Sequence, residues 1–324
     1  MGAVEFRWCV LVVLALAHAG CSDRDETSPA PERPRLAEGS FTAELGGVGV
    51  HYEVHGQGPV LMTVPNSWGL SLQGLRGMYR PLEERLTLVY FDPRGMGGSS
   101  AVGEESDRGM AAVRDDFEAL RAHLGLQRVN AIGWSNGAMN LILLARQHPD
   151  SLESATFVHT VARFTPDDGR TIQEEHPDFV RKVVAFRKEM ENPALGEEQR
   201  DARQRAWWLE EYFPLLFADP DAAAQKLVAA FGEARFSAAH ARFANGEAPT
   251  FDSREDLAAI PVRSLVIAGA HDMLPPERVK EVHDALPDST YLVFEKSGHF
   301  APIEEPEAFR AAVFAFLGVS DPPR

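Results

Sequence analysis

The stretch Gly133-Trp134-Ser135-Asn136-Gly137 stands where an apolar run, Val129 to Ile132, passes directly into a helical run, Ala138 to Gln147. A strand that ends in G-x-S-x-G and turns at once into a helix holds the serine in a strained backbone, with its hydroxyl clear of the sheet. Glycine makes up about 7% of residues, so the bare pattern arises by chance in roughly one chain in ten of this length. The interpretation therefore depends on the rest of the chain.

Two later loops supply the partners that a serine nucleophile needs. Leu265 to Ala268 predicts a short buried strand, and Asp272 follows its end. Tyr291 to Phe294 predicts the next strand, and His299 follows it. All three polar residues then lie at the carboxyl ends of predicted strands, and the order serine, aspartate, histidine is one of the known orders of a Ser-His-Asp triad. Three such placements together are far less probable by chance than the motif alone.

The chemistry of acyl transfer explains these residue types. A serine hydroxyl is a poor nucleophile until an imidazole takes its proton, and a carboxylate fixes the tautomer of that imidazole. We therefore expect Ser135 as nucleophile, His299 as base and Asp272 as the orienting acid. Asp167 or Asp168, in the loop after the sixth predicted strand, is the alternative acid.

The oxyanion that forms during acyl transfer needs two fixed N–H donors. We expect the first from the backbone of Asn136, directly after the nucleophile. The second should come from the loop that follows the predicted strand Val60 to Val64, which reads Pro65-Asn66-Ser67-Trp68-Gly69. Within it we predict the backbone N–H of Ser67 as the donor.

Further motifs resemble a known family. Residues 91–100 read Phe-Asp-Pro-Arg-Gly-Met-Gly-Gly-Ser-Ser and resemble the F-D-Q-R-G-x-G-x-S loop of the proline iminopeptidase-like branch of the α/β-hydrolase superfamily. The resemblance continues through residues 115–126, the serine turn and the Asp272 and His299 loops. It covers residues 41–161 and 252–317 of the predicted core, which comprises residues 41–161 and 252–324. The resemblance implies a serine hydrolase with an α/β-hydrolase fold.

The sequence departs from that branch at two motifs. Members typically show H-G-G-P-G in the oxyanion loop and G-G-S-W-G at the serine turn, whereas this chain has Pro65-Asn66-Ser67-Trp68-Gly69 and Gly133-Trp134-Ser135-Asn136-Gly137. The family's iminopeptidases also hold the free α-amino group of the substrate with acidic residues on a cap. Glu210 and Glu211 are the residues here that match this role, with a different spacing. An N-terminal aminopeptidase and an esterase or amidase both stay open.

The pattern along the chain predicts an α/β architecture. An opening antiparallel hairpin, residues 41–55, precedes alternating strands and helices, and about eight strands result, mostly parallel with helices on both faces. Between residues 162 and 251 the pattern becomes helical, charged and aromatic, which predicts an inserted helical cap. Trp68, Trp134, Trp207 and Trp208 are predicted to border an apolar substrate pocket; for any one cap residue the alternative is that it only holds the cap helices together.

Composition limits the class of partner. The chain has 324 residues, 32 basic and 48 acidic, so its formal charge is 32 − 48 = −16. This charge opposes binding to nucleic acid or to anionic lipids. The adjacent pair His271 and Asp272 lacks further ligands at a recognised spacing, so we expect no metal and no cofactor. The expected partner is a small ester, amide or short peptide substrate; a surface-tethered binding protein that has lost turnover is the alternative of another class.

The amino terminus predicts export. Arg7 precedes about ten apolar residues, Trp8 to Ala17, a length typical of a signal peptide and too short to span a bilayer. Residues 1–20 are the predicted signal peptide and 21–40 a proline-containing, charged tether. Ala19-Gly20-Cys21 resembles a lipobox, which predicts a periplasmic or cell-surface protein with a lipid anchor at Cys21 as its only membrane contact. Cleavage after Ala17-His18-Ala19, giving a freely secreted protein, is the alternative.

Overall fold

The structure, a computed structural model, describes residues 35–320 apart from 166, 167 and 169. The predicted signal peptide and the predicted lipidation site Cys21 lie outside this range, as does Asp167. In the part that is described, every helix is too short or too polar to cross a membrane.

An eight-stranded sheet forms the centre of the fold, in the order β1-β2-β4-β3-β5-β6-β7-β8. β1 and β2, and β2 and β4, pair antiparallel, and the other neighbours pair parallel, which confirms the predicted mixed sheet. The strands are β1 Gly39–Leu45, β2 Val48–His55, β3 Val60–Val64, β4 Thr87–Phe91, β5 Val129–Trp134, β6 Leu152–Val158, β7 Ser264–Gly269 and β8 Ser289–Phe294.

The first strand begins earlier than the sequence predicted. Gly39 and Ser40 were expected in the tether, but they pair with Val54 and Glu53 of β2. Their backbone groups gain partners there, and this extends the hairpin beyond the apolar residues that predicted it.

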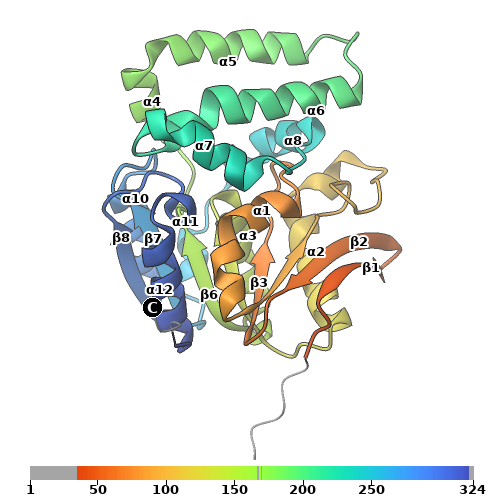
Figure 1. The fold of residues 1–324 in the computed structure, drawn as a ribbon, viewed down its shortest axis with the longest axis vertical. Coiled ribbons are helices and arrows are strands. Elements are labelled where there is room, and N and C mark those ends of the chain that lie inside the picture. Colours follow the sequence, from red (N-terminus) through yellow and green to blue (C-terminus); the bar gives the residue numbers. More distant parts are fainter. Residues whose placement is uncertain (1–34, 166–167, 169, 321–324) are drawn as a thin grey trace, which may run out of the picture. The chain divides into compact units, whose positions relative to one another are not determined.

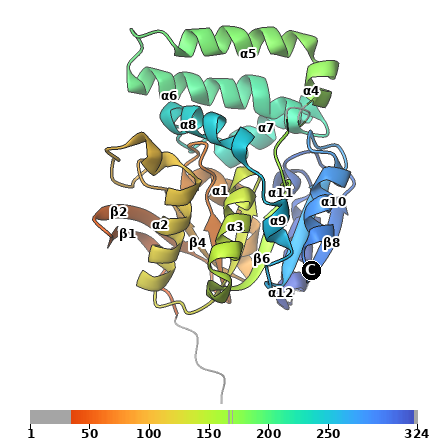
Figure 2. The ribbon, with the colours of Figure 1, turned by 180° about the vertical axis from the view of Figure 1, so that it is seen from behind.

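Helices cover both faces of the sheet, as Figures 1 and 2 show from opposite sides. One layer contains α1 Leu72–Tyr79, α11 Ala301–Glu304 and α12 Pro306–Leu317. The other contains α2 Met110–His123, α3 Asn136–Gln147, α9 Arg254–Leu257 and α10 Pro276–Ala285. Two hydrophobic clusters fill the spaces on either side of the sheet. Because both faces are covered, β3, β4, β5 and β7 are buried at every residue, in agreement with their mostly apolar sequences.

The chain between β6 and β7 forms helices that lie over the carboxyl ends of the parallel strands (Figures 1 and 2). These are α4 Arg170–Glu175, α5 Pro177–Met190, α6 Glu197–Ala206, the π-helical turn η4 Trp207–Tyr212, the 3-10 turn η5 Phe213–Leu216, α7 Pro220–Phe231 and α8 Ala238–Glu247. One tie to the core is the buried His240 of α8, whose Nε2 lies 3.2 Å from the carbonyl oxygen of Arg94. A second is Glu247, whose carboxylate accepts from the backbone N–H of Met110 at 2.9 Å.

The turn between β5 and α3 allows no side chain at its two glycines. A Cβ on Gly133 would lie 2.5 Å from the carbonyl oxygen of Gly137, and a Cβ on Gly137 would lie 2.5 Å from the carbonyl oxygen of Val64. Both are overlaps with backbone, which cannot swing aside as a flexible side chain can. The glycines therefore allow α3 to start close against β3 and β5, and this places Ser135 at the carboxyl end of the sheet.

We expect Gly137→Ala to destabilise the fold by at least about 2 kcal/mol, because Val64 or the start of α3 must move, and to lower Tm by about 4 to 8 °C. Gly246→Ala is the matched control, since Gly246 is also helical and a Cβ added there would meet nothing within 4 Å. That change should raise stability by about 0.5 to 1 kcal/mol. Calorimetry on both variants measures the difference, and equal Tm values would contradict the packing described here.

Candidate active site

Ser135 lies in the sharp turn between β5 and α3. Its φ is 55°, a left-handed conformation that is costly for a residue with a Cβ. The backbone N–H of Ser135 donates to the carbonyl oxygen of Val158 at 2.8 Å, which ties the turn to the end of β6. The Ser135 hydroxyl donates to His299 Nε2 at 2.9 Å. The serine is thus held with its hydroxyl directed at an imidazole, as the motif predicted.

His299 and Asp272 complete a continuous chain of hydrogen bonds. His299 follows β8 and Asp272 follows β7, and His299 Nδ1 lies 2.9 and 3.0 Å from the two carboxylate oxygens of Asp272. The backbone N–H of Leu274 donates to Asp272 Oδ1 at 3.0 Å. The structure therefore brings together the three residues that the sequence assigned to a triad, and all three are buried.

The environment keeps Asp272 ionised. Burial alone would raise the pKa of this carboxyl, but the charge of His299 and the hydrogen bonds from His159 and His299 outweigh it, so the pKa lies well below the usual value. A carboxylate that stays charged at neutral pH can fix the His299 tautomer and stabilise an imidazolium. This pairing of charge and geometry is what general-base catalysis by His299 requires.

A second histidine contacts the same carboxylate. The sequence places His159 at the end of a predicted strand, either lining the pocket or as a hydrogen-bonded structural histidine, and it favours the second interpretation. His159 follows β6, is fully buried, and places Nδ1 2.7 Å from Asp272 Oδ2. The signal available in the sequence was a polar residue at the carboxyl end of a predicted parallel strand, where binding and catalytic residues gather.

His159, Asp272 and His299 form the one group in the described part of the chain that could hold a metal ion. One ligand atom from each of His159, Asp272 and His299 lies within 4.8 Å of the others. Their nitrogen to oxygen separations of 2.7 to 3.0 Å are those of hydrogen bonds, and a shared proton satisfies both partners in each contact. The arrangement is therefore accounted for as a hydrogen-bonded triad with a second imidazole.

The oxyanion loop differs from the prediction. The backbone N–H of Ser67 donates to Asn136 Oδ1 at 2.7 Å, and the Ser67 hydroxyl donates to the same oxygen at 2.8 Å. The next N–H, of Trp68, donates to Asn66 Oδ1 at 3.0 Å. The Ser67 N–H, the predicted second donor, is thus engaged in this conformation by a side chain whose reach the sequence did not reveal.

Asn136 keeps its expected place. It begins α3, so its backbone N–H belongs to the first helical turn, where N–H groups have no intrahelical acceptor. Its side chain is oriented by Ser67, because only the carboxamide oxygen can accept from a backbone N–H. Asn136 Nδ2 is buried and has no hydrogen-bond partner among the described residues. The serine turn therefore offers one backbone donor, next to a carboxamide with an unused N–H group.

A cavity of about 280 Å³ opens from Ser135 and extends under the helices between β6 and β7. Its lining includes aliphatic and sulfur side chains such as Met139, Val161 and Leu274, together with Trp68 and Ser135. The remaining aromatic residues on its surface are Phe164, Phe179, Phe186, Trp207, Trp208 and Tyr212. The structure thus places an apolar, aromatic space directly beside the Ser135 hydroxyl.

Three of the four predicted tryptophans border this cavity. Trp68 and Trp208 lie with ring centroids 5.3 Å apart, and Trp207 stacks on Phe186 at 4.5 Å. Trp207 is only 7% exposed, so it also holds α5 against the helices below. Trp134 is 1% exposed and is not among the lining residues; its Nε1 donates to the carbonyl oxygen of His299 at 2.8 Å. The prediction of substrate contact is wrong for Trp134, because position x of G-x-S-x-G turns here into the core.

The two predicted acidic anchors do not border the cavity. Glu211 forms an ion pair with Lys182 at 2.6 Å, and Glu210 is exposed. Their positions on a π-helical turn direct them away from the space that Trp207, Trp208 and Tyr212 line. Asp168, the alternative triad acid, forms an ion pair with Arg278 at 3.2 Å, so that alternative fails for it.

Comparison with known proteins identifies the family. A model of the alpha/beta hydrolase fold matches residues 64–306, more than half of the chain. This chain belongs to the alpha/beta hydrolase family. Hydrolysis is therefore its reaction class, in agreement with the fold and with the named hydrolases below.

The curated relatives differ in activity. The chain is 29% identical over 279 residues to a putative carbamate hydrolase RutD of Caulobacter sp. (strain K31), covering 83% of this chain and 96% of that protein. It is 26% identical over 241 residues to a proline iminopeptidase of Levilactobacillus brevis, covering 72% of this chain and 79% of that protein.

Solved structures share the fold. An alpha/beta fold family hydrolase from Bacillus anthracis str. Sterne superposes with a TM-score of 0.69 at 20% identity, over 86% of this chain and 99% of that one. An enol-lactonase from Burkholderia xenovorans LB400 superposes with a TM-score of 0.66 at 23% identity, over 86% of this chain and 100% of that one. At these identities the superpositions establish the architecture alone.

We expect Asn136→Asp to lower kcat by about 100-fold or more, because an ionised carboxylate beside the serine turn would oppose the developing oxyanion. Asn136→Ala is the control: it removes the side chain but keeps the backbone N–H, so its effect should be at least about tenfold smaller. Steady-state kinetics on an activated ester, after equal Tm values have shown that both variants fold, measures this. Equal rates for the two variants would place the oxyanion elsewhere.

Proposed function

We propose that this protein is a serine hydrolase that cleaves small carboxylic esters with an apolar acyl group through an acyl-enzyme on Ser135. The single observation that supports it most is the chain of hydrogen bonds from Ser135 through His299 to Asp272 at the base of an aromatic cavity. Serine nucleophile, general base and orienting acid are all within hydrogen-bonding distance.

The reaction follows from these contacts. His299 Nε2 takes the Ser135 proton while Oγ forms a bond to the acyl carbon, and Nδ1 keeps its proton toward Asp272. The bond from carbon to the alcohol oxygen then breaks, and the proton on Nε2 passes to the leaving alcohol. Water enters, loses a proton to the same nitrogen and attacks the acyl-enzyme, which releases the acid and restores the serine.

The oxyanion needs two donors, one from the serine turn and one from the loop after β3. The backbone N–H of Asn136 is the first, as in other serine turns of this kind. The N–H of Ser67 becomes the second when its bond to Asn136 Oδ1 opens. A carbonyl oxygen that develops negative charge is a stronger acceptor than a neutral carboxamide, so the transition state favours this exchange.

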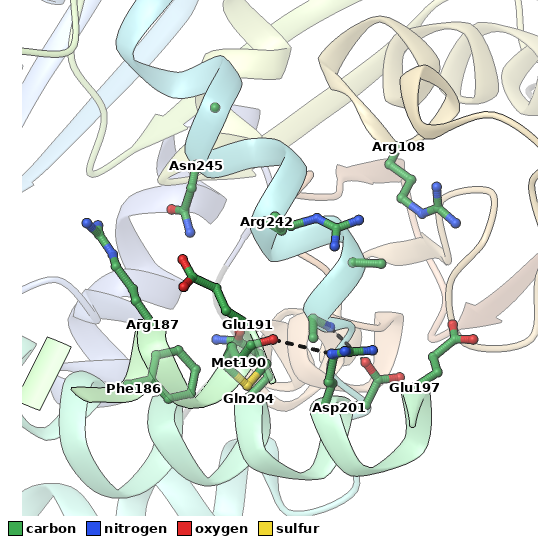
Figure 3. Close-up of a pocket in the computed structure, with 14 residues that line it drawn as sticks. Arg108, Phe186, Arg187, Met190, Glu191, Glu197, Asp201, Gln204, Arg242 and Asn245 are labelled. Atoms are coloured by element: carbon green, nitrogen blue, oxygen red, sulfur yellow. Dashed lines mark hydrogen bonds between the residues drawn. The ribbon is translucent and has the colours of Figure 1, made fainter. Parts of the chain in front are cut away.

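The charge of the cavity argues for an ester over a free amino-terminal peptide. No aspartate or glutamate among the described residues lines it, and the only fully charged side chain that does is Arg187 of α5. Arg187 forms no ion pair within the described part of the chain. It lies where the cavity meets an outer hollow of about 700 Å³, and both share Phe186, Arg187, Gln204 and Asn245 (Figure 3). Within the cavity, an ammonium group on the substrate would meet this guanidinium with no lining carboxylate to offset it, since Glu191, Glu197 and Asp201 line only the outer hollow.

We expect the kcat/KM of p-nitrophenyl 6-aminohexanoate to fall below that of p-nitrophenyl hexanoate by about fivefold or more, since repulsion between two solvated charges in contact costs about 1 kcal/mol. Arg187→Gln should narrow this difference, whereas Glu210→Gln and Glu211→Gln should leave it unchanged. All three variants alter residues on the outer helices, so they are matched for position in the fold.

The same panel tests the aminopeptidase alternative that the relatives' names raise. Amino-acid arylamides with a free amine should react no faster than their N-acetylated forms. Faster turnover of the free amines, lost in Glu210→Gln or Glu211→Gln, would replace the esterase with an aminopeptidase. Absence of turnover on every substrate, in protein shown to be folded, would favour a binding protein with this fold.

A further inference from the structure

The carboxyl end of β6 contacts all three loops that carry the proposed triad. The carbonyl oxygen of Val158 accepts from the N–H of Ser135 at 2.8 Å. The ring of the next residue, His159, bonds to Asp272 Oδ2 at 2.7 Å and accepts at Nε2 from the backbone N–H of Ala301 at 3.2 Å. Ala301 begins α11, two residues after His299. One imidazole therefore links the loop of the acid to the loop of the base.

These contacts fix the tautomer of His159. A backbone N–H can only donate, so Nε2 must carry a lone pair toward Ala301. In a neutral ring the proton is then on Nδ1, which donates to Asp272. Burial lowers the pKa of His159 and outweighs the opposing effect of its hydrogen bond to Asp272, in agreement with a neutral ring. Asp272 thus accepts one imidazole N–H from each side, from His159 and from His299.

The backbone at His159 is strained to make this contact. Its φ is 52°, and within the described chain only His159 and Ser135 have a positive φ without being glycine. Such a conformation costs on the order of 1 kcal/mol or more. The N–H of His159 donates to the carbonyl oxygen of Ile267 at 2.8 Å, so β7 holds this backbone in place. The strain places the ring against Asp272 and away from the regular path of β6.

We propose that His159 is a positioning residue of the triad, which holds the Asp272 carboxylate in line with His299 and fixes the spacing of the two loops. The proposal rests on the proposed function. His159 does not touch the reacting atoms. It acts through Asp272, whose Oδ2 would otherwise be a buried anionic oxygen with only the shared contact to His299.

The hydrogen bond from His159 Nδ1 to Asp272 also sets how much negative charge the carboxylate presents to His299. A donor on the far side of a carboxylate withdraws part of its charge, so loss of that donor leaves a stronger attraction for a protonated His299. The titratable groups that face Asp272 and His299 are His159 after β6 and Tyr212 of η4, whose pKa is raised by burial and then by the charge of Asp272; the Ser135 hydroxyl also contacts His299. Without the His159 donor, protonated His299 is favoured and the acid limb of kcat/KM moves to higher pH.

Two variants at this position separate the hydrogen bond from the fold. His159→Asn keeps an N–H donor toward Asp272, and asparagine tolerates a positive φ. His159→Gly also tolerates the backbone but donates nothing. We expect the glycine variant to lose about 10- to 100-fold in kcat with little change in KM and to shift its acid limb upward, and the asparagine variant to keep the limb of the wild type and most of kcat. Two results would overturn the proposal. One is an equal loss of kcat in both variants with the acid limb of kcat/KM at the wild-type pH, and the other is a glycine variant with the kcat and acid limb of the wild type.

Proton NMR gives a readout that does not depend on turnover. Imidazole N–H protons bonded to a buried carboxylate resonate far downfield, so the wild type should show two such signals, from Nδ1 of His159 and of His299. His159→Asn should lose one signal and keep the other. A single signal in the wild type, with His159→Asn unchanged, would overturn the proposal. Two signals in a protein without ester hydrolysis would contradict the proposed function and leave the positioning contact in place.

Discussion

The burial of one carboxylate is the constraint on which the site depends. An ionised Asp272 without partners would cost several kcal/mol, so the fold is stable only when donors from other segments meet it. They come from the ends of three strands: His159 after β6, Leu274 in the loop after β7, and His299 after β8. The parallel register of these strands brings all the donors to one edge of the sheet. The same requirement that keeps the charge satisfied also aligns His299 with Ser135.

Much of this could be predicted because it depends on strand ends. A residue just past a parallel strand lies at the carboxyl edge wherever the strand sits in the sheet, so Ser135, Asp272 and His299 were identifiable before their contacts were known. The mixed eight-stranded sheet could be predicted from the alternation of strand-like and helix-like segments and from the opening hairpin. The start of β1 at Gly39 did not, because backbone pairing decides it and glycine and serine carry no strand signal.

The errors concern side chains whose direction the sequence does not determine. The Ser67 N–H was predicted as an oxyanion donor, and the sequence did not show that the Asn136 side-chain oxygen would reach it. Trp134 lies in the serine motif but points into the core. Glu211 forms an ion pair with Lys182 of α5 and does not line the cavity. His159 was expected to be hydrogen-bonded or to line the pocket, but its partner Asp272 was not predicted, because Asp272 follows a different strand. Each outcome depends on distances between segments far apart in the chain.

The central claim is that Ser135 is an activated nucleophile, and covalent labelling tests it most directly. Folded protein would be treated with a fluorophosphonate probe at neutral pH beside Ser135→Ala, and the modified peptide identified by mass spectrometry. A single probe adduct is expected on the peptide that contains Ser135, and none on Ser135→Ala. Folded wild-type protein that takes up no probe, or takes it up on another residue, would contradict it.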